Sequence, residues 1–205
     1  MAQVKKASVR DAILHSAFAL FKENGYAETT LAHIGAGAGV TVSNIYNYFD
    51  SKLEILYAVY DPWLEQRLDR LVADVSHIEA PREKLKSIFL TLFRDIPAED
   101  GGFVNNLLQA LSARQPGELY SSDLLLRSEA KISAILRDIV PQRNRRLAED
   151  DMFSHLLFMA FDGFAVHYKL RGKSRRVEAI CDMLSDLILA DPGHRETNEI
   201  RRKEP

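Results

Sequence analysis

The sequence predicts an all-α protein of about nine helices, with an N-terminal three-helix unit followed by a larger helical bundle. Apolar residues recur at helical spacing along most of the chain. The strict apolar–polar alternation of β-strands never persists, and glycine and proline fall mostly where helices would begin or end. Together these observations favour a fold built from helices alone.

The composition is that of a globular protein and not of a polycation. Apolar residues make up 46% of the 205 residues and charged residues 27%, and the formal net charge is −2. Cys181 is the single cysteine, which excludes an intramolecular disulfide framework and a multi-cysteine metal site. There is no secretory leader and no apolar run of membrane-spanning length, so we expect a cytoplasmic protein.

The first helix is predicted over residues 8–24. Ser8 is a suitable N-cap, and the pair Asn24-Gly25 is a typical helix stop. Two short helices are predicted next, over 30–38 and 41–48, with Gly39 between them.

A longer helix is predicted to begin at Ser51, because Ser51-Lys52-Leu53-Glu54 matches a capping box. Pro62 removes a backbone hydrogen bond, so a kink or a break is expected at Asp61-Pro62, with a second segment from Trp63 to Val75. This helix is the only covalent route from the N-terminal unit into the rest of the chain. We therefore expect it to act as the lever between the two.

Regular proline and glycine punctuation marks the remaining helices. They are predicted over 81–96, 103–113, 122–140, 150–170 and 174–190. The tail has little apolar content and should be disordered. The predicted division is a helix-turn-helix unit over residues 1–52, a ligand-binding and dimerisation unit over 53–190, and a tail over 191–205.

Residues 25–56 carry the functional information. Two helices of about two turns joined at a glycine have the format of a helix-turn-helix. Thr30 would cap a helix start whose free N–H groups suit a phosphate, and Lys52 also suits a phosphate. In the second short helix Ile45 and Phe49 face inward. The opposite face is polar and aromatic and suits a major groove, where asparagine pairs with adenine; its members are Val42, Ser43, Tyr46 and Asn47.

This stretch resembles the DNA-binding domain of the TetR (tetracycline-repressor-like) family. The resemblance covers about the first 58 residues, and beyond them only the helical architecture is shared. The shared marks are Gly25-Tyr26, Thr29-Thr30, Ile34, Ala38-Gly39-Val40, Ile45-Tyr46-Asn47-Tyr48-Phe49, Ser51-Lys52 and Leu56.

The resemblance implies a role in DNA binding for eight residues. Thr30 and Lys52 correspond to phosphate contacts. The recognition helix supplies contacts to bases and phosphates through Thr41, Val42, Ser43, Tyr46, Asn47 and Tyr48. The sequence departs from the family at Val42-Ser43, where Lys-Gly is common. It also departs at Gly35 and Gly37, each costing about 1 kcal/mol in helix propensity.

His155, Asp162 and His167 invite a metal site. His155 and Asp162 share a helix face, but His167 lies about 120° around the axis from His155. We interpret them as satisfied or pocket-lining polar groups, and we expect no metal and no cofactor. No catalytic motif is present, so an enzyme is not expected.

The leading hypothesis is a ligand-responsive transcriptional regulator, a repressor that binds a palindromic operator in double-stranded DNA as a homodimer. The last two helices are expected to form the dimer interface, because residues 150–170 are apolar nearly all round. The effector is expected to be a largely apolar small molecule, bound by pocket residues that the sequence does not identify. The alternative is a helical small-molecule-binding or scaffolding protein that has lost specific DNA binding, which the absent Lys-Gly pair would favour.

Overall fold

A computed structural model describes residues 2–113 and 122–190. Within them the regular secondary structure is entirely helical, which confirms the all-α prediction. Eight of the α-helices in this part exceed a single turn, close to the predicted number. The helices are α1 (Ala2–Glu28), α2 (Leu31–Ala38), α3 (Val42–Ile45), α4 (Lys52–Ser76), α5 (Pro81–Leu90), α6 (Ile96–Glu99), α7 (Phe103–Ser112), α8 (Asp123–Ile139), α9 (Arg146–Glu149), α10 (Met152–Arg171) and α11 (Val177–Leu189).

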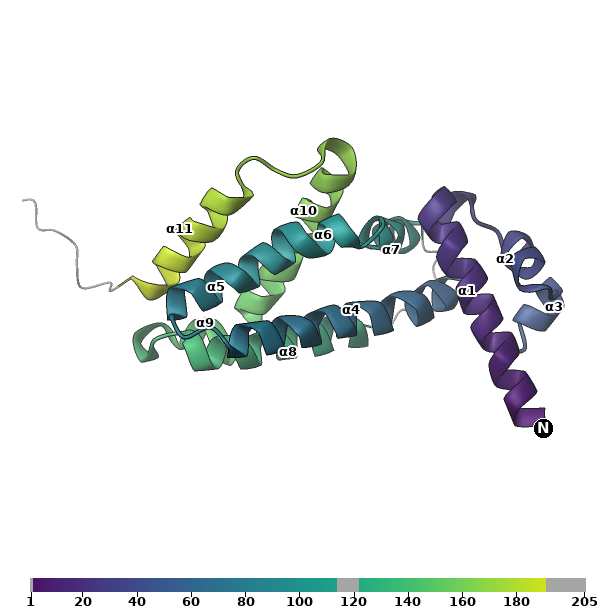
Figure 1. Cartoon of the computed structure of the whole chain (residues 1–205), viewed down its shortest axis with the longest axis horizontal. Coiled ribbons are helices and arrows are strands. Elements are labelled where there is room, and N and C mark those ends of the chain that lie inside the picture. The colour runs from purple at the N-terminus through teal and green to yellow at the C-terminus, as the bar shows by residue number, and fades with distance from the viewer. Residues whose placement is uncertain (1, 114–121, 191–205) are drawn as a thin grey trace, which may run out of the picture.

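Helices α1–α3 lie at one end of the molecule, and α4 runs from them along the length of the remaining helices (Figure 1). We call α1–α3 the N-terminal head and α4–α11 the helical body. Within the body, α11 packs on α5, while α10 contacts α7 and α8. A π-helical turn (Thr91–Asp95) joins α5 to α6, and a 3-10 turn (Gln142–Asn144) precedes α9. The predicted disordered tail, 191–205, lies outside the described residues.

Helix α1 begins earlier than predicted, but the helix stop predicted at Gly25 is present. It begins at Ala2 and not at Ser8, because the preceding residues include good helix formers that continue the helix. Gly25 leaves helical geometry, with φ 80° and ψ 172°, so the predicted stop is present as a kink before a final turn to Glu28. Such a positive φ favours glycine.

Of the kink or break expected at Pro62, the break is wrong, because α4 continues through the proline to Ser76. A proline inside a helix costs about 3 kcal/mol. Buried leucines at positions 56, 64 and 68 pack on both sides of it. The Arg127 guanidinium of α8 also pairs with Asp61, at 2.6 Å, and with Glu65, at 3.2 Å. These contacts before and after the proline hold the two halves in one helix.

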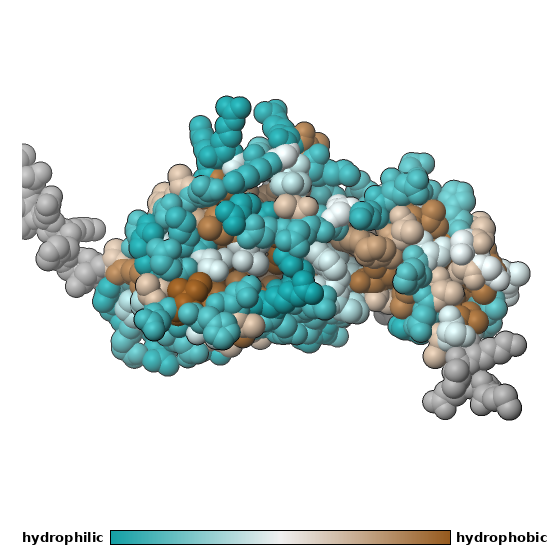
Figure 2. Space-filling model, viewed as in Figure 1, coloured by the Kyte–Doolittle hydropathy of each residue, from teal (hydrophilic) through white to brown (hydrophobic). Residues whose placement is uncertain are grey.

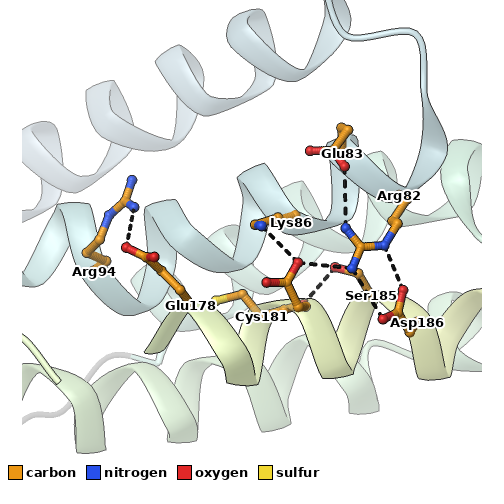
Figure 3. Close-up of polar contacts among 9 residues, drawn as sticks. Arg82, Glu83, Lys86, Arg94, Glu178, Cys181, Ser185 and Asp186 are labelled. Carbon is orange, nitrogen blue, oxygen red and sulfur yellow. Dashed lines mark hydrogen bonds and ion pairs between the residues drawn. The ribbon is translucent and has the colours of Figure 1, made fainter. Parts of the chain in front are cut away.

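Helix α11 is held to the body along one face. Val177, Cys181, Ser185 and Ile188 are buried there. Ion pairs border this face (Figure 3): Arg82 lies 2.7 Å from Asp186, and Lys86 lies 2.8 Å from Asp182. The opposite face of α11 is left to solvent.

No helix in the described part of the chain combines the length and the apolar character needed to cross a membrane.

The glycines of α2 have a packing role that the sequence did not reveal. A Cβ added to Gly35 would lie 2.7 Å from the Val40 carbonyl oxygen, and one added to Gly37 would overlap Ser16 Oγ. Ser16 Oγ donates to the Ile34 carbonyl at 2.9 Å, which joins α1 to α2. The cost in helix propensity is therefore offset by close packing.

Gly35→Ala is expected to lower the free energy of unfolding, although alanine is the better helix former by about 1 kcal/mol. The added methyl meets backbone that cannot turn aside, and overpacking costs about 1–3 kcal/mol. Urea unfolding of the variant measures the difference. A variant as stable as the parent would show that the turn after α2 relaxes freely.

Candidate nucleic-acid interface and ligand cavity

Two capped helix starts and a glycine turn build the helix-turn-helix. Thr30 Oγ1 accepts the His33 N–H at 3.2 Å, which confirms the predicted cap of α2. Thr41 Oγ1 accepts the Asn44 N–H at 3.2 Å and caps α3 in the same way. Between them Gly39, with φ 68°, ends α2 in the left-handed conformation. The two helix starts therefore have fixed positions in the head.

The predicted DNA-contacting side chains differ in exposure. Ile45 and Phe49 are buried, as predicted. Val42 and Tyr48 are half-buried. The exposed ones are Thr30, Thr41, Ser43, Tyr46 and Asn47. The structure thus brings four exposed residues together on and beside α3, with Thr30 at the start of α2.

Lys52 has partners inside the head. Its ammonium donates to the carbonyls of Tyr26 and Thr29, both at 2.8 Å, and lies 4.1 Å from the centre of the Tyr26 ring. Burial lowers the pKa of Lys52, and the nearby Glu28 carboxylate partly offsets this. Lys52 therefore joins the start of α4 to the end of α1. Its contact with a DNA phosphate stays a prediction.

The capping box at the start of α4 is confirmed with a small change of register. Ser51 Oγ accepts the Glu54 N–H at 3.0 Å. The Glu54 carboxylate accepts the N–H of Asp50, one residue before the cap. Arg10 lies beside this region, exposed, with its guanidinium 5.1 Å from the centre of the Phe49 ring. This contact holds an exposed cation of α1 against the segment between α3 and α4.

A cavity of about 190 Å³ lies between α4, α7, α8 and α10. Leucines from α4, α7 and α8 and phenylalanines from α10 form most of its wall. Its polar groups come from Tyr57 and Tyr60 of α4, Ser128 of α8 and Asp162 of α10. Sequence reasoning left the pocket residues unidentified, because apolar positions that line a cavity follow the same periodicity as those that fill a core.

Of the three residues considered for a metal, only Asp162 lines the cavity. His155 Nδ1 lies 2.7 Å from Glu129 Oε1, and Glu129 is buried. No group of three histidine, cysteine or acidic side chains within the described residues is placed to hold a metal ion.

Asp162 has a raised pKa of about 6, because burial disfavours its charged form. Its ordinary pKa is about 3.9. A carboxyl group whose pKa is raised on folding stabilises the folded state at low pH, and this contribution is lost as the pH rises through the folded pKa. Asp162→Asn should therefore unfold at a higher temperature than the parent at a pH of about 7, with the difference shrinking toward a pH of about 4. Circular-dichroism melts across this range check it, and a difference independent of pH would contradict it.

Helix α7 connects the cavity to the head. The amide of Asn106 is buried; its Nδ2 donates to the Phe21 carbonyl at 2.9 Å, and its Oδ1 accepts the Tyr26 N–H at 3.0 Å. Phe103 stacks on Phe18 of α1, with ring centres 5.2 Å apart. Apolar side chains gather at the surface where the head meets the body (Figure 2). The lever helix α4 is therefore not the only contact between head and body.

Known proteins are similar to this chain in N-terminal sequence and in fold. The family described as bacterial regulatory proteins, tetR family, matches residues 13–59. The HTH-type transcriptional repressor KstR2 of Mycolicibacterium smegmatis is 30% identical over 90 residues, 44% of either chain. The fatty acid metabolism regulator protein of Bacillus subtilis is 32% identical over 73 residues, 36% of this chain and 38% of the regulator. The matches thus span less than half of these relatives.

Two solved structures extend the likeness to most of the chain. FadR from Thermus thermophilus, a TetR-family transcriptional repressor in complex with lauroyl-CoA, superposes with a TM-score of 0.66 at 19% identity, over 87% of this chain and 92% of that one. FadR from Bacillus subtilis in complex with stearoyl-CoA gives 0.58 at 20% identity, over 87% and 97%. At these identities the likeness shows the fold. The family match places residues 13–59 among the tetR family of bacterial regulatory proteins, and the superpositions show that the chain as a whole shares the fold of these regulators.

Proposed function

We propose that the protein is a ligand-responsive DNA-binding transcriptional regulator, a repressor that leaves a palindromic operator when a small molecule binds. Residues 1–52 would bind DNA, and residues 53–190 would bind the ligand and form the dimer. The observation that carries this proposal is the exposed polar face of α3, which belongs to a TetR-family helix-turn-helix joined through Asn106 to a helix that lines an apolar cavity.

Each exposed residue of the interface has a chemistry suited to DNA. Asn47 can pair with the major-groove edge of adenine through two hydrogen bonds. Thr30 and Thr41 stand at helix starts, where hydroxyl and N–H groups suit phosphate oxygens. Ser43 and Tyr46 add hydroxyl groups on the same surface. The half-buried side chains of Val42 and Tyr48 would supply apolar contacts to DNA and contacts at the edge of the interface.

The dimer would form on α10 and α11. On α10 the exposed apolar residues and Gly163 follow alternating steps of four and three, which places them on one helix face, while exposed His155, Lys169 and Arg171 fall outside that spacing. The face consists of Met152, Leu156, Met159, Gly163, Val166 and Leu170. Met183 and Leu187 of α11 are also exposed, opposite the face that packs on α5. A second copy covering this surface would remove these side chains from water and set the spacing of two recognition helices, about 34–36 Å on DNA.

Ligand control requires a ligand that prefers one of two conformations. The cavity suits a largely apolar effector, and two transcriptional regulators of similar fold are in complex with acyl-CoA molecules. Ligand in the cavity contacts α7, and α7 holds the end of α1 through Asn106. We propose that this contact, together with α4, transmits ligand binding to the head.

Mobility-shift assays with DNA from the protein's own genomic neighbourhood test the proposal. Asn47→Ala is expected to relax the preference at one position of each half-site, at a cost of about 1–3 kcal/mol, because an adenine would lose its two hydrogen bonds. The matched control is Asn24→Ala, an exposed asparagine of α1 outside the interface. Absence of any shift at low salt would favour the alternative, a helical ligand-binding or scaffolding protein without specific DNA binding.

A further inference from the structure

The polar groups at the cavity wall are the hydroxyls of Tyr57, Tyr60 and Ser128 and the single carboxyl group of Asp162. Ser128 is 2% exposed, and its hydroxyl is buried without a hydrogen-bond partner within the described chain. A buried hydroxyl left unpaired costs about 1–3 kcal/mol, so a ligand group that pairs with it would remove that cost. The carboxyl group of Asp162 arrives from α10 on the same cavity.

The charge of the wall restricts the ligand. An ionised carboxylate only accepts hydrogen bonds. No lysine, arginine or histidine is among the cavity-lining residues in the described part of the chain. A ligand carboxylate would therefore bring a second negative charge next to Asp162 with no cation to balance it, and like charges at such a contact are costly. A head group that donates a hydrogen bond would instead satisfy both Asp162 and Ser128.

The volume of the cavity restricts the size of the ligand. The cavity, about 190 Å³, is somewhat larger than a cavity of about 150 Å³ that holds benzene. A ligand of one ring with a short chain would fit within it.

We propose that the cavity selects a small apolar molecule whose head group donates a hydrogen bond, an alcohol, a phenol or an amine, and that it discriminates against carboxylates. Asp162 and Ser128 are the residues that determine this choice. The role of such a molecule as the effector rests on the proposed function, whereas its binding does not.

Three probes with one skeleton test the choice of head group: 3-phenylpropan-1-ol, 3-phenylpropylamine and 3-phenylpropionate. Binding is followed by calorimetry and by the fluorescence of Trp63, the single tryptophan, whose ring stacks on cavity-lining Tyr60 at 5.8 Å. At a pH of about 7.5, where an aspartate with a pKa near 6 is ionised, the alcohol and the amine should bind at least about tenfold more tightly than the carboxylate.

Variants assign the effect to the two residues. Asp162→Asn should reduce the affinity for the amine about tenfold or more and so reduce the difference in affinity between the amine and the carboxylate. Ser128→Ala should reduce the affinity for the alcohol several-fold. Asp138→Asn, an exposed acidic residue of α8, is the control and should leave all three affinities unchanged. Melting curves establish that each variant is folded. A carboxylate that binds as well as the amine, a preference that survives Asp162→Asn, or no binding by any probe would overturn the proposal.

DNA release separates this inference from the proposed function. If the donor probes bind with the expected order but never release DNA, the ligand class stands and the regulatory role fails. If lauroyl-CoA or 3-phenylpropionate releases DNA while the donor probes do not, the regulatory role stands and the ligand class is overturned.

Discussion

Asn106→Ala is expected to lower the free energy of unfolding by about 2–4 kcal/mol and to weaken the ligand's control of DNA binding. The side chain is 4% exposed and satisfies the Phe21 carbonyl and the Tyr26 N–H. Alanine would leave both backbone groups buried without a partner, at about 1–3 kcal/mol each. Because these bonds join α7 to α1, their loss also removes a contact through which the cavity restrains the head.

Asn105→Ala is the matched control. Asn105 is the neighbouring residue of α7, and its amide donates to the Ala165 carbonyl of α10 at 3.3 Å, within the body. The Asn105→Ala variant should retain the parent's response of DNA binding to ligand. Denaturant unfolding and DNA-binding titrations with and without ligand compare the two variants. Equal effects of the two on ligand control would show that Asn106 has no special role in coupling.

If the proposed dimer forms on α10 and α11, Leu156→Glu is expected to convert it to a monomer and to weaken operator binding by about 100-fold or more. Leu156 is 60% exposed and lies on the apolar face of α10. In a two-fold interface each substitution occurs twice, so two carboxylates would be buried together. Loss of the dimer removes the gain from binding two half-sites at once, which is about 10²–10⁴-fold.

Leu126→Glu provides the comparison for the dimer prediction. Leu126 is 55% exposed on α8, outside the α10 and α11 surface. The Leu126→Glu substitution should leave both the oligomeric state and DNA binding unchanged. Sedimentation velocity at micromolar concentration measures the assembly. A Leu156→Glu protein that remains a dimer would place the interface elsewhere.

Local signals explain what could be predicted from the sequence. Caps such as Thr30 and Ser51 act on neighbouring N–H groups, so the starts of α2 and α4 were predicted to within one residue. Gly25 was identified because few other residues adopt its conformation. These features depend on only a few consecutive residues.

Long-range contacts explain which features could not be predicted from the sequence. The ion pairs on either side of Pro62 in α4 come from Arg127 of α8, which lies more than sixty residues later in the chain. Asn106 sits in an apolar helical pattern, and nothing near it in sequence shows that its partners belong to α1. Lys52 matches a phosphate-contacting position, but the sequence does not show that its ammonium donates to the carbonyls of Tyr26 and Thr29.

Hydroxyl-radical footprinting of the operator complex is the most direct test of the central claim, that this chain reads DNA as a dimer through α3. We expect two symmetric protected half-sites whose centres lie one helical turn apart, about 34–36 Å, or a multiple of it. Protection within each half-site should weaken in Asn47→Ala. A single unsymmetric patch, or protection that Asn47→Ala leaves unchanged, would contradict the claim.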